Sequence, residues 1–458
     1  MRISRFPRKL AGESKGVDNF MMTYYSWLAL LSLRRNYVLS QLMIFSIALG
    51  VALTMTAFTI LYVVSRDPIP AKSNQLFAVQ IDNGGPRSRK PGDVEPPSQL
   101  SWRDASALLQ VRLGLREAAM YETGITVMPE DPGMKAFPVA GRATTGDFFS
   151  MFQVPLLFGS EWSRDEDSSS ASVVVISKRL NQKLFGGQNS VGRNIRFNDA
   201  SWRIVGVVDD WDPKPRFYDV VGGMAFEEGA DIYLPLNTSV DKGWATQEYE
   251  FCDAGPRGTT FEDLLKSECV WLQYWVELPK ADDVESYQNF LSNYARDQQR
   301  VSRFTWDPNV RLRNVRDWLV AQKVVPDDAK LSVVVALTFL LCCLVSAVAL
   351  MLAKSSARAA EFGIRRALGA DSTAVFSQAL VEAGIVGILG GVLGVGLSLI
   401  SLHTLRDLFP RGMGRIAYMD GTLLVVTVLF AVIATLCAGI YPAWRATRLS
   451  LAAQLKGG

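Results

Sequence analysis

The sequence lacks most of the side chains that enzyme chemistry and metal binding need. It contains one histidine in 458 residues, His403, and no cluster of partner residues surrounds it. A histidine-based triad or a histidine-ligated metal site would have to use that residue. No segment fits the G-x-x-x-x-G-K-[ST] pattern of a phosphate-binding loop. We therefore expect no catalytic residue, no metal site and no directly bound cofactor.

Charge is missing from long stretches of the chain. Residues 38–64 and 331–353 carry no charged side chain, and two further apolar stretches cover 374–402 and 421–441. A helix needs about 20 apolar residues to cross a bilayer. The sequence therefore predicts four transmembrane helices, at 37–64, 331–353, 374–402 and 421–441. This pattern excludes a soluble protein and a carrier with many helices around a buried substrate path.

The placement of charge predicts the topology. Segment 1–36 has seven basic and two acidic residues, loop 354–371 has four and two, and tail 442–458 has three basic residues only. Residues 65–330 have 31 basic and 38 acidic residues. By the positive-inside rule, both termini and the 354–373 loop lie in the cytoplasm. Residues 65–330 and the short 403–420 loop then lie outside. The net charge of only +3 gives no reason to expect a nucleic-acid partner.

The outer segment 65–330 mixes short strands and helices, which predicts an α+β domain of two lobes with an insertion near 241–269. The expected strands are 76–81, 173–177, 202–209, 232–236 and 271–278, and the expected helices are 101–115, 178–185 and 282–299. The predicted fold is a membrane protein with four transmembrane α-helices and this large α+β domain between the first and second. Cys252 and Cys269 are the only cysteines of the outer segment, so we expect them to form a disulfide.

Two cytoplasmic segments have amphipathic character. Aromatic residues and leucines in 24–33 precede Arg34 and Arg35, which suits either a short helix lying on membrane lipids or the first turns of a long first helix. In the 354–373 loop, Glu361 and Arg365 are spaced for a helical ion pair. We expect a short helix there that docks a soluble partner; its residues are Arg358, Glu361, Phe362, Gly363, Ile364, Arg365, Arg366, Leu368 and Gly369.

The third apolar stretch has two features of its own. Gly387 and Gly391, and Gly390 and Gly394, are each four residues apart, a spacing that lets helix backbones approach closely. We expect these glycines to pack on span two or four, or across a dimer. Glu382 is a charged residue inside this stretch. Such a residue usually faces protein or water, so we expect it to bond to the docking helix backbone or to a nearby arginine. The alternative is that it snorkels to the membrane surface and has no special function.

The docking segment, R-x-x-E-F-G-I-R-R-A-L-G-A at 358–370, resembles the coupling helix of FtsX/MacB-type ABC transporter permeases. Other segments resemble this family in the same order. They are 36–51, which ends in I-A-L-G-V, 381–383 (V-E-A) with the glycines after it, and 439–446 (G-I-Y-P-A-W-R-A). In the outer segment, 145–149 (T-G-D-F-F), 155–159 (P-L-L-F-G), 184–187 (L-F-G-G), 191–193 (V-G-R) and 205–208 (V-G-V-V) resemble the MacB periplasmic core. The family pattern T-P-G-Y-F is altered at 145–149.

The resemblance implies a permease subunit in a bacterial inner membrane, with the large domain in the periplasm. It implies that ATP and magnesium are used by a separate ABC ATPase subunit, because MacB carries a fused ATPase and this sequence contains none. It also implies a homodimer or a heterodimer with a second permease, and a periplasmic adaptor if the chain drives MacB-like efflux through an outer-membrane duct. The alternatives are an FtsX-like module that controls a cell-wall hydrolase or an antibiotic-peptide response, and LolC/LolE-like extraction of lipoproteins. The substrate is left open.

Overall fold

The computed structural model describes residues 31–85, 94–198, 200–247, 250–252, 258–357, 372–408 and 421–448. These residues form two compact units. One unit takes its residues from both sides of the outer segment, within 1–63 and 326–458, and the other lies within 64–325. The docking segment predicted at 358–370 lies outside the described residues, as does most of the segment 1–36.

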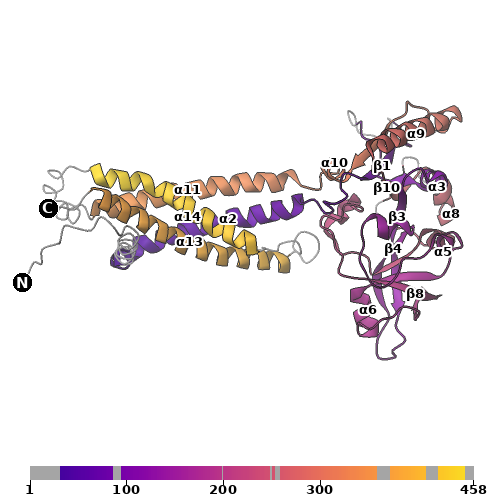
Figure 1. Ribbon diagram of the computed structural model, residues 1–458, viewed down its shortest axis with the longest axis horizontal. Coiled ribbons are helices and arrows are strands. Elements are labelled where there is room, and N and C mark those ends of the chain that lie inside the picture. Colours follow the sequence, from indigo (N-terminus) through magenta and orange to yellow (C-terminus); the bar gives the residue numbers. More distant parts are fainter. Residues whose placement is uncertain are drawn as a thin grey trace, which may run out of the picture. The chain divides into compact units, whose positions relative to one another are not determined.

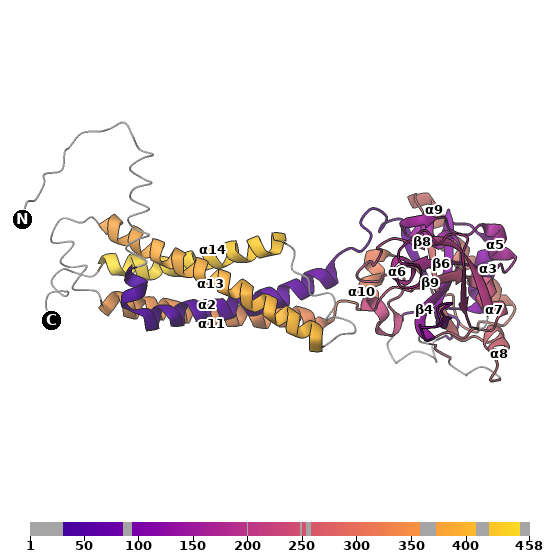
Figure 2. The same cartoon turned by 90° about the horizontal axis from the view of Figure 1, so that it is seen from below.

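The first unit consists of long apolar helices. Among the described residues, four helices are long and apolar enough to cross a membrane. They are α2 (Tyr37–Ser65), α11 (Asp327–Ala357), α13 (Ser372–Leu408) and α14 (Gly421–Arg448). Figures 1 and 2 both show them side by side. Their shared core includes Ile47, Val51, Leu340, Val386 and Ala431, one or two from each helix.

The second unit contains a mixed sheet, with helices in the connections between its strands. The main strand order is β11-β1-β10-β3-β4-β9-β6-β8-β5; β2 pairs with β10, and β7 bridges β3 and β8. The β4–β9 and β6–β8 pairs are parallel and the others antiparallel. The strands are β1 (Leu76–Ile81), β2 (Leu100–Ser101), β3 (Arg116–Met128), β4 (Phe137–Thr144), β5 (Leu156–Gly159), β6 (Val173–Ser177), β7 (Asn194–Phe197), β8 (Ala200–Val208), β9 (Ile232–Pro235), β10 (Val270–Glu277) and β11 (Val310–Asn314).

Several helices of this unit begin at a side chain that caps them. Ser101, Ser177 and Asn314 each accept a hydrogen bond from the backbone N–H three residues on, as expected of N-cap residues. The helices are α3 (Trp102–Val111), α4 (Asp147–Met151), α5 (Arg164–Ser168), α6 (Lys178–Phe185), α7 (Leu236–Asp241), α8 (Phe261–Lys266), α9 (Ala281–Arg300) and α10 (Val315–Ala321), with the 3-10 helix η2 (Val221–Phe226).

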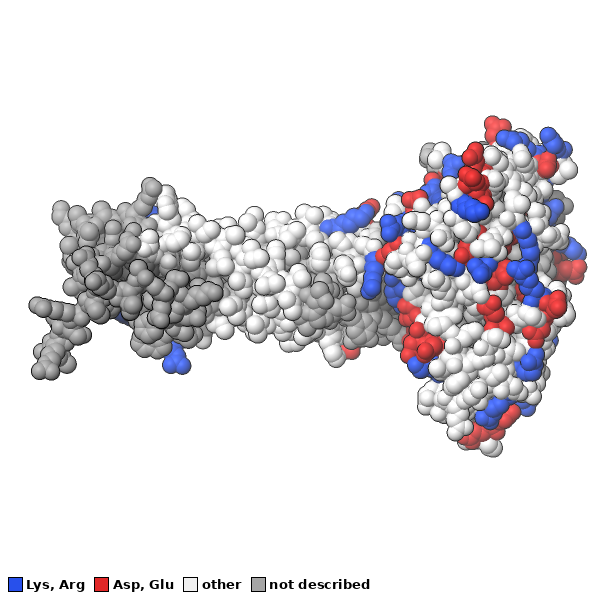
Figure 3. All heavy atoms as spheres, viewed as in Figure 1, with Lys and Arg blue, Asp and Glu red and all other residues white. Residues whose placement is uncertain are grey.

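The fold class expected from the sequence is confirmed: four apolar helices, with a mixed α/β domain between the first and second. The division of that domain into two lobes stays a prediction, because the strand order runs through it without a break. On the face drawn in Figure 3, the described atoms of the four long helices are almost all uncharged. The surface of the second unit, by contrast, carries both signs of charge intermixed.

Candidate functional site

The glycines of α13 lie at two helix contacts. A Cβ atom added to Gly387 or Gly391 would meet α14, at Thr435 and Ala431 respectively. One added to Gly390 would lie 2.8 Å from Ile47 of α2, and Gly394 faces the same helix. The prediction of span four as a partner therefore agrees with the structure for one pair. The other pair packs on the first span rather than the second. The members of each pair, four residues apart, share a face of α13, and the faces of the two pairs are rotated from each other.

Glu382 of α13 is paired with Lys354 of α11. Its Oε1 lies 2.5 Å from Nζ of Lys354, and it also accepts a hydrogen bond from Ser32 Oγ at 2.9 Å. The sequence reading placed Lys354 at the start of the cytoplasmic loop. The structure extends α11 to Ala357, so that Lys354 is a helical residue and is buried.

The two chain connections of the second unit are linked to each other. The first leads from α2 into β1, and the second leads from β11 through α10 to α11. Strands β1 and β11 pair antiparallel over five residues, from Phe77 opposite Asn314 to Ile81 opposite Val310. Beyond the strands, Asp67 forms an ion pair with Arg316 at 2.9 Å. A displacement of one connection is therefore shared with the other.

Lys72 joins the first connection to the body of the domain. Its Nζ lies 2.7 Å from Glu277 of β10 and donates hydrogen bonds to the backbone carbonyls of Ser150 and Met151. Glu277 is buried and is also paired with Arg116 of β3 at 2.8 Å. A buried carboxylate with two cationic partners is strongly held in place.

Trp318 anchors α10, the last helix before α11. Its indole N–H donates to the carbonyl of Phe217 at 3.0 Å, and its ring lies edge-on to Trp275. Phe217 in turn contacts Phe152 and Trp275 edge-on. This aromatic cluster joins α10 to β10 and to the loop before η2. No pattern in the sequence indicated it, because its members are single aromatic residues far apart in the chain.

Two buried arginines also form contacts with the loop before η2, which contains Phe217. Arg142 of β4 donates to Asp219 and, at 3.2 Å, to Glu122 of β3. Arg216 lies 2.9 Å from Asp219, which also accepts a hydrogen bond from Gln273. Burial raises the pKa of Glu122, and the two arginines oppose that rise. Isolated charges in separate strands give no sequence signal of such a network.

The segments that resemble the MacB core stabilise the fold of the second unit. Thr145 Oγ1 donates to the carbonyl of Glu117 at 3.0 Å, and Phe148 and Phe149 are buried in the aromatic core. Gly159 has φ +71°, and an added Cβ would lie 2.1 Å from the carbonyl oxygen of Val205, so only glycine fits there. These motifs specify the core of the domain.

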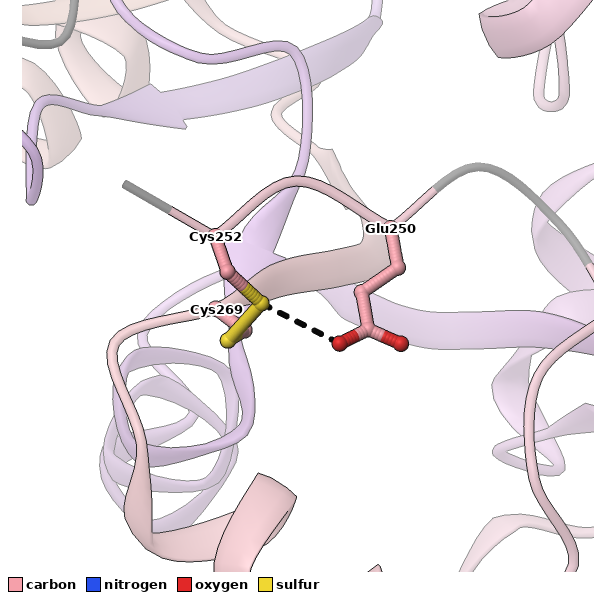
Figure 4. A group of neighbouring side chains, drawn as sticks. All are labelled: Glu250, Cys252 and Cys269. Carbon is pink, nitrogen blue, oxygen red and sulfur yellow. Dashed lines mark hydrogen bonds between the residues drawn. A yellow bond between two sulfur atoms is a disulfide. The ribbon is translucent and has the colours of Figure 1, made fainter. Parts of the chain in front are cut away.

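The expected disulfide is present in the structure. Cys252 and Cys269 are bonded and close a loop with a sequence separation of 17. Figure 4 shows Glu250 beside them, with its Oε1 3.1 Å from Cys252 Sγ. Because both sulfur atoms are used in the disulfide, neither is a free thiolate ligand for a metal.

A polar cavity of about 670 Å³ opens beside the disulfide. Arg103 and Arg303 line it, and both pair with Glu268, at 2.7 and 2.6 Å. Arg303 is also paired with the buried Asp104 at 2.7 Å. These pairings largely neutralise the arginines, so the cavity is not a strong anion site.

Comparison with known proteins gives the class of this chain. Residues 40–294 match the MacB-like periplasmic core domain, and residues 333–451 match the FtsX-like permease C-terminal domain. The chain belongs to this FtsX/MacB family of permeases.

Its curated relatives include the Macrolide export ATP-binding/permease protein MacB of Rhodopirellula baltica, 23% identical over 92% of this chain and 60% of that protein. The protein of the same name from Azoarcus sp. is 23% identical over 92% of this chain and 57% of its own length. The chain therefore spans about 60% of such relatives.

Similar solved structures include the periplasmic region of MacB from Actinobacillus actinomycetemcomitans (TM-score 0.35, 14% identity, 56% of this chain and 96% of that one). Another is the extracellular domain of the ABC-type transporter YknZ (TM-score 0.33, 12% identity, 52% of this chain and 100% of that one).

Proposed function

We propose that this chain is the membrane subunit of an ABC transporter and converts ATP-driven motion of an ATPase subunit into motion of its outer domain. The observation that carries the proposal is the pair of connections to that domain. Both are continuous with the first two membrane helices, and both are joined by the β1–β11 pair and the ion pair of Asp67 with Arg316. Motion of either helix therefore enters one shared element.

In this proposal the ATPase binds segment 354–373 from the cytoplasm, which also contains both termini, and the outer domain lies in the periplasm of a bacterium. The membrane subunit works as a dimer, with itself or with a second permease. The relatives named above are macrolide exporters by name, and this supports efflux of a periplasmic substrate through an adaptor and an outer-membrane duct.

The docking prediction is tested with Arg365→Glu combined with Arg366→Glu. Charge reversal at the docking helix should abolish co-purification of the ATPase while the outer domain stays folded. Arg34→Glu with Arg35→Glu is the matched control, since it reverses an adjacent basic pair outside the docking segment and should retain the ATPase. Undiminished ATPase with the docking variant would contradict the proposal.

The topology is tested with a cysteine variant of the second unit. Ser201 is exposed on β8, so a cysteine placed there should react with a membrane-impermeant maleimide added to the periplasmic side. Reaction only after the membrane is opened would contradict the topology. The efflux part has a separate test: cells expressing the chain with its ATPase should tolerate more macrolide than cells with the docking variant. Equal macrolide tolerance would contradict the proposal of macrolide efflux, but it would not contradict the proposal that the chain is a transporter subunit.

A further inference from the structure

Four polar side chains meet inside the bundle of long helices. Lys354 Nζ lies 2.5 Å from Glu382 Oε1 and donates a hydrogen bond to Ser40 Oγ at 3.0 Å. Ser32, in the helical turn before α2, donates to Glu382 at 2.9 Å. The group therefore connects α2, α11 and α13 at one place.

This group is buried beside an apolar core. The side chains of Lys354 and Glu382 are 4% and 15% exposed. The adjoining core contains Met43, Leu350 and Met351. An ionised amine or carboxylate is costly in such surroundings and is tolerated when it is paired and hydrogen-bonded. The ion pair joins one residue of α13 to one residue of α11 and so fixes the axial register of the two helices. A shift by one helical turn, about 5.4 Å, would separate the charges within the apolar core.

The position of the pair along the chain gives it a function. Lys354 stands three residues before the end of α11 at Ala357, and Glu382 stands ten residues after the start of α13 at Ser372. The segment between those two helix ends contains the predicted docking helix. The ion pair therefore closes the base of the loop on which the ATPase is expected to act. Through Ser40 it also reaches the helix that leads into the outer domain.

We propose that Lys354 and Glu382 are positioning residues that make α2, α11 and α13 move as one block when the docking loop is displaced. This inference rests on the proposed function and deepens it, because α2 and α11 are the two helices that continue into the outer domain. Without the pair, displacement of the loop would be absorbed by sliding of α13 along α11.

The test uses variants that change both members of the ion pair together, so that neither Lys354 nor Glu382 is left without the other. Lys354→Met with Glu382→Leu removes both charges at similar volume, and Lys354→Glu with Glu382→Lys exchanges them. Thr54→Val is the control: Thr54 donates to the carbonyl of Ala336 at 3.1 Å, so it removes another α2–α11 contact that is buried but uncharged. Thermal melting of each purified chain shows that it is folded.

Coupling is measured on the complex with its ATPase in lipid nanodiscs. Spin labels on Ser201→Cys and on the native Cys437, with Cys342 and Cys343 replaced by alanine, report movement of the outer domain relative to α14. The ratio of ATP-dependent distance change to ATP turnover is the readout. A merely stabilising contact would not change it.

We expect the apolar double variant to hydrolyse ATP while the ratio falls about fivefold or more, the range of ordinary coupling free energies. The exchanged pair should restore much of the ratio, and Thr54→Val should leave it unchanged. A full ratio in the apolar variant, or a loss equal to that of Thr54→Val, would overturn the inference and leave the proposed function intact. If the wild-type complex turns over ATP without any distance change, the proposed function itself fails.

Discussion

Replacing Gly390 by alanine tests how closely α13 packs on α2. The added Cβ would lie 2.8 Å from Cγ2 and 3.1 Å from Cβ of Ile47, well inside the ordinary carbon–carbon separation of about 3.5–4.0 Å. Ile47 is fully buried, so either its side chain or the whole helix must shift. Overpacking of this kind costs about 1–3 kcal/mol of the free energy of unfolding.

A second glycine of the same helix supplies the control. Alanine is a better helix former than glycine by about 1 kcal/mol, and this gain offsets part of the expected cost. Gly396 has no atom within 4 Å of an added Cβ, so Gly396→Ala receives the same gain without the clash. The difference between the two variants should therefore be about 1–3 kcal/mol, with Gly390→Ala the less stable.

The assay uses the chain's own cysteines. Cys343 is buried between α2 and α11, next to Gly50, whereas Cys342 and Cys437 are exposed. With the latter two replaced by alanine, Cys343 is the remaining free thiol, because Cys252 and Cys269 are bonded. A fluorogenic maleimide then reports unfolding of the helices during heating in detergent. Equal melting temperatures for the two glycine variants would refute the packing of α13 on α2.

Three further predictions concern the outer domain. Burial raises the pKa of Asp167 from 3.8 to about 6, so between these pH values unfolding releases a proton and the free energy of unfolding falls as the pH rises. Asp167→Asn should therefore recover up to about 3 kcal/mol of the free energy of unfolding at pH 8 but not at pH 4. Denaturant titrations followed by tryptophan fluorescence measure this difference. Trp318→Phe, which keeps a ring but loses the hydrogen bond to Phe217, should lower the free energy of unfolding by about 1 kcal/mol in the same titration, and no change would contradict the anchoring of α10. Replacing Cys252 and Cys269 together by serine should lower the free energy of unfolding by about 3 kcal/mol, since the disulfide closes a loop of 17 residues in the unfolded chain. Equal stability of the wild-type protein with and without a reductant would contradict a stabilising disulfide.

Several elements of the outer domain could be placed from local pattern alone. Strands β1 and β6 and helix α6 have the predicted bounds, because each is a short apolar or amphipathic run between clear turn residues. Strands β3 and β4 were not predicted. Strand β3 contains Glu117 and Glu122, and a glutamate is rarely buried unless it is paired. The structure buries both, since Tyr274 donates to the first and Arg142 to the second.

For the candidate site, too, some features were predicted from the sequence and others were not. The glycine spacing on α13, the polar Glu382 and the cysteine pair were visible as residue types in a pattern. Two of the contacts were not predicted: Glu382 pairs with Lys354, and the second glycine pair packs on the first span. The docking residues at 358–369 lie outside the described part of the chain, and their role stays a prediction.

The sequence by itself determined where the chain can cross a membrane and that a large domain follows the first crossing. The reason is that the thickness of the hydrocarbon layer imposes a length of apolar chain whatever the neighbours are. Only the tertiary structure decided the strand order, the joining of the two connections through β1 and β11, and the pairing of Lys354 with Glu382. Those features depend on distances between residues far apart in the chain, and the cost of burying a charge is removed only by a partner that folding brings to it.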